Sequence, residues 1–248
     1  MAQGRKRKRR RATFYTPIAV VLIAIAVYFG ISVFFRVTDI EIVGAERYTA
    51  EQILSASRVS RGDNLLLLDT KEVTENITTR LPYISDVVVE KRIPDKITMT
   101  VTESRPVAAI DVGGQWWLLD QKGRALEKAE RVDIAGKVRV EGLAPENVVA
   151  GQALVVSQKD EKKREAVSRL LIALEREGMM GRCEWIDVSN IAALTMRYDN
   201  RFTVVLGTID KIDKNLVRLV GVIDQIEEGE TGRIDMTDDF EARFIPDS

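Results

Sequence analysis

The chain of 248 residues contains 37 Lys and Arg, 38 Asp and Glu, one Cys and no His, which gives a formal net charge of −1. The absence of His excludes Ser-His-Asp and Cys-His catalytic pairs and His-ligated zinc. The lone Cys183 cannot form an intrachain disulfide. The composition therefore offers no candidate catalytic residue, metal site or cofactor of these kinds.

The N-terminal segment begins with a basic stretch and continues with an apolar one. The basic stretch consists of Arg5, Lys6, Arg7, Lys8, Arg9, Arg10 and Arg11. Residues 12–35 carry no charge, and as a helix Pro17–Phe35 would span roughly 28 Å, close to the ~30 Å core of a bilayer. Basic flanks stay on the cytoplasmic side. The pattern predicts a basic cytoplasmic tail over 1–16, one transmembrane helix over 17–35, and all later residues outside the cytoplasm.

Other interpretations of this segment stay open. A cleaved signal peptide has the same order of stretches, and Ala24-Ile25-Ala26 fits a cleavage pattern, although the apolar run continues through it. Arg10-Arg11 ahead of Phe14 is a poor match to a twin-arginine export signal. A basic run can also bind nucleic acid, but residues 36–248 hold 30 Lys and Arg against 38 Asp and Glu and are unsuited to it.

The elements after Phe35 have the order β-α-α-β-β. A strand from Val37 to Val43 ends at Gly44, and Thr49-Ala50-Glu51-Gln52 has the form of a capping box that starts a helix reaching about Ser57. Asp69 is a suitable N-cap for a second helix over Thr70–Leu81. Alternating patterns predict strands at Ser85–Lys91 and Lys96–Glu103.

The remaining chain is predicted to be rich in strands, with two helices. The helices are expected at Ser157–Glu177, with Ser157 as cap, and at Lys211–Gln225. The expected strands are Val107–Val112, Gln115–Leu119, Ala125–Glu127, Val138–Val140, Glu184–Ser189, Ala192–Tyr198, Phe202–Leu206, Arg233–Thr237 and Phe240–Ile245. Tight turns are expected at Gly113-Gly114 and Asp199-Asn200.

Several motifs in sequence order resemble the FtsQ/DivIB bacterial cell-division family. They are IEIVGAERYTAEQIL, GDNLLLLD and LPYISDVVVEKRIPDKITMTVTESRPVA, followed by WLLDQKG and the Ile-Asp-Met piece near the C-terminus. The resemblance implies an α+β chain with a transmembrane helix, a POTRA domain at 36–106 and a mixed β-domain with two helices at 107–248. It also implies a single-pass type II protein of the inner or plasma membrane at the division septum.

In this family the function is recruitment, not catalysis, so the resemblance implies a divisome scaffold that binds FtsB (DivIC) and FtsL through the β-domain. We expect the last strand to offer an open sheet edge for a partner strand. The candidate partner-binding residues are Phe240, Glu241, Ala242, Arg243, Phe244 and Ile245, with Phe240, Ala242 and Phe244 facing the core. A weaker candidate is the POTRA strand surface formed by Thr98, Thr100 and Thr102.

Two functions of other classes are also considered. An envelope enzyme could use the carboxylate pair Asp238-Asp239, but adjacent carboxylates in a turn point apart. A POTRA protein of envelope assembly or secretion is the other alternative, although such modules normally occur in tandem or before a β-barrel. Whether the host has an outer membrane is left open by the sequence.

Overall fold

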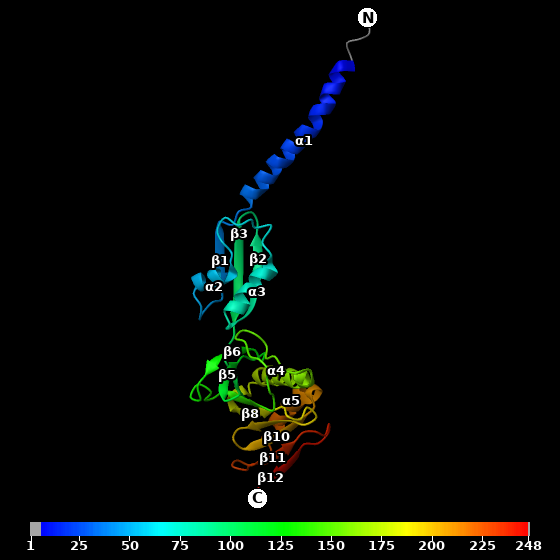
Figure 1. The fold of residues 1–248 in the computed structure, drawn as a ribbon. Helices are drawn as coiled ribbons and strands as arrows, with labels where there is room; N and C mark the ends of the chain where they lie inside the picture. Colours follow the sequence, from blue (N-terminus) through cyan, green and yellow to red (C-terminus); the bar gives the residue numbers. More distant parts are fainter. Residues whose placement is uncertain (1–5, 248) are drawn as a thin grey trace. The chain divides into compact units, whose positions relative to one another are not determined.

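A computed structural model describes residues 6–247, without the side chains of residues 6–16, 27, 28 and 32. The chain divides into two compact units (Figure 1). The first holds Met1–Ile77 and Asp86–Thr102, and the second holds Thr78–Ser85 and Glu103–Ser248. The predicted topology signal lies outside this description, because Arg5 is not described and the side chains of Lys6, Arg7, Lys8, Arg9, Arg10 and Arg11 are not either.

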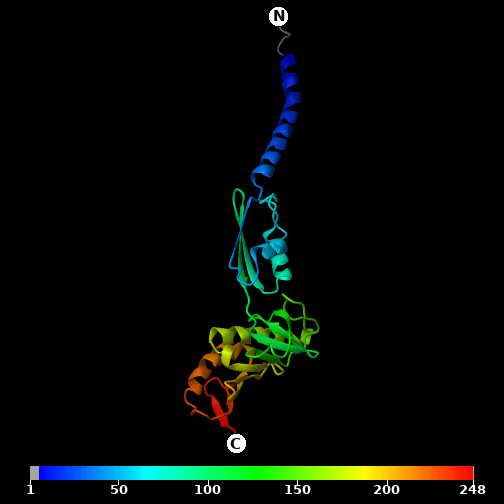
Figure 2. The same cartoon turned by 90° about the vertical axis from the view of Figure 1, so that its left-hand side faces the viewer.

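The first unit begins with a helix of 29 residues, α1 (Lys6–Phe34). The elements that follow are β1 (Asp39–Val43), α2 (Ala50–Ser57), α3 (Thr70–Arg80), β2 (Ile84–Arg92) and β3 (Lys96–Glu103). The three strands form one sheet in the order β1-β3-β2, with β1 parallel to β3. Figure 2 shows α2 and α3 on the same side of these strands. The order of elements is the β-α-α-β-β pattern predicted from the sequence.

Two local signals in the first unit act as the sequence predicts. Thr49 accepts a hydrogen bond from the Gln52 backbone N–H, and the Gln52 side chain accepts from the Thr49 N–H, which completes the capping box of α2. Gly44 ends β1 with a positive φ of 88°, and a Cβ there would overlap the carbonyl oxygen of Val101. Only glycine fits this close approach of two strands.

The second unit is built on one sheet of nine strands. The strands are β4 (Ala108–Val112), β5 (Gln115–Leu119), β6 (Ala125–Ala129), β7 (Val138–Glu141), β8 (Cys183–Asp187), β9 (Leu194–Tyr198), β10 (Phe202–Gly207), β11 (Gly232–Asp235) and β12 (Arg243–Pro246). Their order is β12-β11-β10-β9-β8-β7-β4-β5-β6. The pairs β4 with β7, β7 with β8, and β10 with β11 are parallel, and the other pairs are antiparallel.

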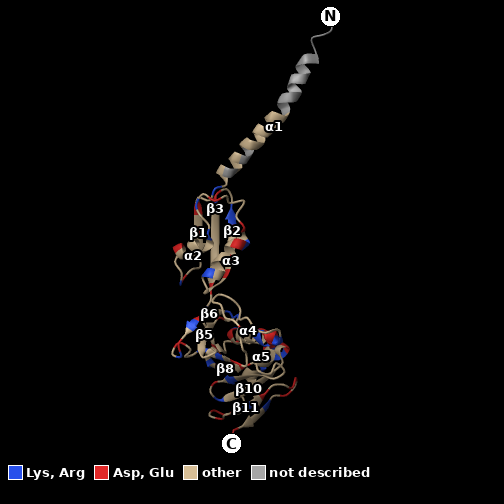
Figure 3. Cartoon of the chain, in the orientation of Figure 1, with Lys and Arg blue, Asp and Glu red and all other residues tan. Residues whose placement is uncertain are grey.

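Two helices, α4 (Glu161–Arg176) and α5 (Ile212–Ile223), pack their apolar faces on this sheet. Figure 3 shows acidic and basic residues interspersed along the outward side of the helices. Arg169 and Arg176 both pair with Asp213, at 2.9 and 3.0 Å, and so join α4 to α5. Short 3-10 turns precede helix or strand at Gln158–Asp160, Met180–Arg182 and Ile209–Lys211. Ser157 does not cap the backbone as predicted, because its hydroxyl donates to the Asp160 carboxylate instead.

Two completely buried polar side chains inside the second unit are held by several hydrogen bonds. Asp120 is completely buried and accepts from the guanidinium and backbone N–H of Arg124 and from the Ser104 hydroxyl. Asn215 is also completely buried, and its amide donates to the carbonyls of Leu206 at 2.9 Å and Met236 at 2.8 Å. Asn215 thus satisfies the carbonyl of Leu206, the penultimate residue of β10, and that of Met236, which directly follows β11.

Candidate functional site

Strand β12 lies at one edge of the nine-stranded sheet and pairs only with β11 among the described strands. Asp247 donates its backbone N–H to Thr231 at 2.9 Å, just beyond the strand. Because hydrogen-bonded and non-bonded pairs alternate in an antiparallel ladder, the N–H and C=O of Phe244 point away from β11. Pro246, which follows two residues later, has no N–H to offer. β12 therefore presents a short open edge with Phe244 at its centre.

The edge strand is fixed to the core through one aromatic side chain. Phe244 packs edge-on against the fully buried Phe202 of β10, with ring centroids 6.1 Å apart. Gly232 of β11 makes this possible, because a Cβ there would overlap the Ile245 carbonyl oxygen and lie 2.8 Å from the Phe244 ring. Phe244 therefore packs β12 against the core of the second unit.

The predicted strand Phe240–Ile245 is wrong at its start, since β12 begins at Arg243. The Asp238 carboxylate accepts the backbone N–H groups of Phe240, at 2.8 Å, and of Glu241, at 3.1 Å. This Asx-type turn prevents the extended conformation over these residues. Phe240 consequently does not face the core and is 92% exposed, whereas Ala242 and Phe244 do pack against it.

The turn before β12 is held by charges from α5 and from the 3-10 turn Ile209–Lys211 before it. Asp239 pairs with Lys211 at 3.2 Å and Lys214 at 3.3 Å, and these hydrogen bonds lower the pKa of its carboxyl group. Hydrogen bonds from the backbone of Phe240 and Glu241 lower the pKa of Asp238. Both carboxyl groups therefore stay ionised at neutral pH, and neither has the raised pKa of a general acid. The carboxylate pair weighed for catalysis thus serves to hold the turn.

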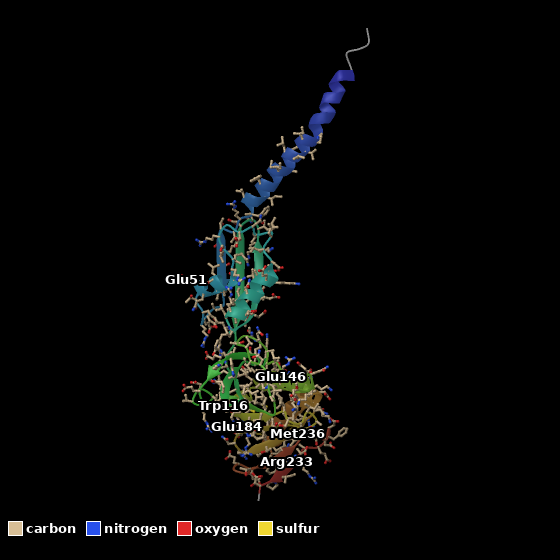
Figure 4. The ribbon with its side chains drawn as sticks, in the orientation of Figure 1. Glu51, Trp116, Glu146, Glu184, Arg233 and Met236 are labelled. Atoms are coloured by element: carbon tan, nitrogen blue, oxygen red, sulfur yellow. The ribbon has the colours of Figure 1, made fainter. Side chains whose placement is uncertain are left out.

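The face of the sheet beside this edge carries polar residues that the sequence interpretation missed. Strand register aligns Arg197, Thr203, Arg233 and Ile245 across β9 to β12. Arg233 is exposed at the β11 end of the second unit (Figure 4), and Ile245 is 47% exposed. The alternation of apolar and polar residues in β11 would have been enough to predict an outward-facing Arg233. The pairing of β11 with β10 could not be predicted, because it depends on two segments that are separated in the sequence.

The weaker POTRA candidate is partly wrong. Strand β3 is the central strand of its sheet and not an edge strand. Thr98 is only 5% exposed, because Glu41 of β1 covers its hydroxyl at 3.3 Å. Thr100 and Thr102 are exposed as expected.

The adjacent tryptophans of β5 have different surroundings. Trp117 packs against the core, with the Lys128 amine 5.6 Å from its ring centroid. Trp116 is half-buried outside that core (Figure 4). Neighbouring side chains of a strand point to opposite faces of the sheet, which accounts for this difference.

Two further properties concern the described part of the chain as a whole. Within residues 6–247 no three Cys, Asp or Glu side chains come together as metal ligands. Among the helices described there, none is long and apolar enough to cross a membrane.

Known proteins resemble this chain over most of its length. Residues 35–104 match the family model described as "POTRA domain, FtsQ-type". The cell division protein DivIB of Clostridium botulinum strain Hall is 25% identical over 235 residues, which cover 94% of this chain and 90% of the relative. DivIB of Clostridium tetani is 22% identical over 195 residues, 79% and 72% of the two chains.

A shorter match has a different name. The cell division protein FtsQ of Anaeromyxobacter sp. strain K is 34% identical over 94 residues, 38% of this chain and 31% of the relative. These matches and the β-α-α-β-β unit define a protein with a POTRA domain of FtsQ type. Over most of its length the chain is similar to the cell division proteins named DivIB, and over a shorter stretch to one named FtsQ.

Proposed function

We propose that this protein is a non-catalytic scaffold of the bacterial division machinery, located at the septum. Support comes from the three relatives described above, each of which carries the name cell division protein. Support also comes from the chemistry of the one carboxylate pair considered for catalysis, since Asp238 and Asp239 are engaged in a turn.

The scaffold is proposed to be a single-pass type II protein with its N-terminus in the cytoplasm. The uncharged run Pro17–Phe35 after seven basic residues supports an anchor. The exposure of large apolar side chains along α1, such as Leu22 at 61% and Phe29 at 63%, also supports an anchor, because contact of such side chains with water is unfavourable. The corresponding division is a tail at 1–16, an anchor at 17–35, a POTRA domain at 36–106 and a β-domain at 107–248.

The proposed partners are single-pass proteins of the FtsB (DivIC) and FtsL type, bound through strand addition at β12. The observation that carries this proposal is the open, ordered edge centred on Phe244. Arg243 and Ile245 project beside that edge, and the exposed ring of Phe240 lies just before it. Thr100 and Thr102 remain a second candidate surface for other membrane proteins of the division machinery.

The strand-addition proposal is tested by changing the edge without removing Phe244. An Ile245→Lys variant places a charge where a partner strand would lie, and we expect capture of FtsB- and FtsL-type ectodomains to fall at least about tenfold, an effect of roughly 1.4 kcal/mol. Deletion of Phe240–Ser248 should abolish capture. The matched control is Val217→Lys on α5, a residue that is 57% exposed and remote in sequence from the edge.

Capture is measured by pull-down from membranes that contain the full chain and tagged partners. Mid-cell localisation of a fluorescent fusion is scored in parallel, because it depends on the division role and not on one partner. Unchanged capture by both edge variants would overturn strand addition, whereas a fusion spread evenly around the cell would overturn the division role.

A further inference from the structure

The end of the first unit where α1 joins it exposes large apolar side chains on two separate loops. Leu66 and Leu67, in the loop before α3, are 44% and 82% exposed. Ile93, in the β2–β3 hairpin, is 67% exposed. We refer to Leu66, Leu67 and Ile93 as the apolar tip. The neighbouring Leu65 is completely buried. Of the four consecutive leucines 65–68, it is the only one that is fully part of the core.

Hydrogen bonds bring both loops to the segment Phe35–Thr38, which leaves α1. Phe35 accepts from the Leu65 N–H at 2.7 Å, and the Val37 N–H donates to Asp63 at 2.8 Å. The Thr38 N–H donates to the Asp95 carbonyl at 2.9 Å in the hairpin. The Lys91 amine also reaches the Leu66 carbonyl at 3.2 Å. The apolar tip is therefore held next to the first residues after α1, and these hydrogen bonds do not depend on the direction of α1.

The charges at this end suit a lipid headgroup layer. Arg36 and Arg61 are exposed there, and the exposed Arg92 pairs with Glu90 at 3.3 Å. The nearby acidic groups bind donors of the chain itself, because Asp63 accepts from the Ser60 N–H at 2.8 Å and Asp95 accepts from the Thr38 hydroxyl. Apolar side chains flanked by arginines match the boundary between acyl chains and phosphates.

We propose that the apolar tip inserts into the outer headgroup layer of the membrane that α1 enters, so that the POTRA unit is a lipid-contacting module. The occupant is the phospholipid surface, because Phe35 connects the tip directly to the apolar run Pro17–Phe35. This inference rests on the proposed anchor. It explains why Leu66, Leu67 and Ile93 are apolar at positions where the folded unit leaves them uncovered.

The test uses the full chain reconstituted in vesicles of phosphatidylethanolamine and phosphatidylglycerol, with an environment-sensitive NBD label at single introduced cysteines. The native Cys183 does not interfere, because it is 6% exposed and burial raises the pKa of its thiol to about 12. The labelled variants are Leu67→Cys and Ile93→Cys. The control Glu46→Cys is exposed and follows the opposite end of β1. Leu22→Cys in α1 reports on the anchor.

The expected result is a shift of the emission at positions 67 and 93 to shorter wavelength, together with loss of intensity when lipids carry a nitroxide in the headgroup region. Position 46 should show neither. A Leu67→Glu change in the Ile93→Cys variant should remove the shift at 93, whereas Val88→Glu, at an exposed position of β2, should leave it unchanged.

Three outcomes overturn the inference. Emission at 67 and 93 equal to that at 46, with position 22 quenched by deep nitroxide lipids, would leave the anchor standing and remove the lipid contact. A shift without quenching would indicate that protein, not lipid, covers the apolar tip. Absence of quenching at position 22 would overturn the anchor itself, and the lipid contact with it.

Discussion

At the scale of single residues, the second unit contains buried polar side chains whose hydrogen-bond partners lie far away in the sequence. Asn215 donates to the carbonyls of Leu206 in β10 and Met236 just after β11, while its own oxygen accepts from Arg218 at 3.2 Å. The sequence predicted only that a helix surrounds Asn215, because its partners lie 9 and 21 residues away. No local pattern distinguishes such an asparagine from one in water.

An Asn215→Leu variant is expected to destabilise the second unit. Each buried carbonyl that loses its donor costs about 1–3 kcal/mol, so the midpoint of urea unfolding should fall clearly. Tryptophan fluorescence reports this unit alone, since Trp116, Trp117 and Trp185 all belong to it. Gln225→Leu removes an exposed amide instead and should change the midpoint little. Equal effects of the two variants would contradict this role of Asn215.

The stability of the second unit should also depend on acid pH. Hydrogen bonds from Arg169, followed by Arg176, lower the pKa of Asp213 from its ordinary value of 3.8. A group with a lowered pKa in the folded state stabilises it above the unfolded pKa, and this contribution is lost as the pH falls through the folded pKa. The loss therefore occurs below about pH 4 and not near neutrality.

An Asp213→Asn variant should show a smaller drop in stability between pH 6 and pH 3 than the unchanged protein. Urea unfolding at both pH values measures this difference. Asp133→Asn, which changes a carboxylate in the loop between β6 and β7, serves as the control. The assignment to Asp213 fails if its variant and the unchanged protein lose stability equally.

At the scale of elements, the sequence predicts nearly every helix and strand because local chemistry defines them. The Thr49 capping box starts α2, and strand β3 begins and ends where the alternation at Lys96–Glu103 predicts. The prediction fails at Phe240, where the Asp238 turn overrides the alternation. The parallel pairing of β10 with β11 was also unpredicted, since a helix separates them in the sequence. The contacts that create the edge are thus long-range ones.

Gly232→Ala is expected to displace β12. The added Cβ would meet the Ile245 carbonyl and the Phe244 ring, and overpacking of this kind typically costs about 1–3 kcal/mol. Weaker docking of β12 should increase hydrogen exchange at residues 243–247 more than at β9, as measured by mass spectrometry. Gly181→Ala, where a Cβ meets nothing within 4 Å, is the matched control. Unchanged exchange in β12 would show that the edge tolerates the extra methyl group.

At the scale of the whole molecule, the proposed anchor and the proposed binding edge belong to different units. The first unit contains α1, and the second contains the sheet edge at β12. If Pro17–Phe35 serves only as an anchor, its exact residues should matter less than its insertion and orientation.

Replacement of Pro17–Phe35 by an unrelated transmembrane helix of equal length, with the basic tail kept, should preserve septal localisation and cell length. Fluorescence microscopy and membrane fractionation of cells that depend on the variant measure both. Normal insertion with filamentous cells would show that the helix itself binds a partner.

The small size of β12 also bears on what the protein must avoid. An open strand can pair with copies of the same chain as well as with the partner strand proposed above. Here the strand has four residues and ends in Pro246, which supplies no N–H for a further ladder. The edge can bind one short strand, but it offers too few backbone hydrogen-bonding groups for many molecules to stack on one another. Even when many molecules crowd at one ring around the cell, the edge should favour defined pairs over aggregates.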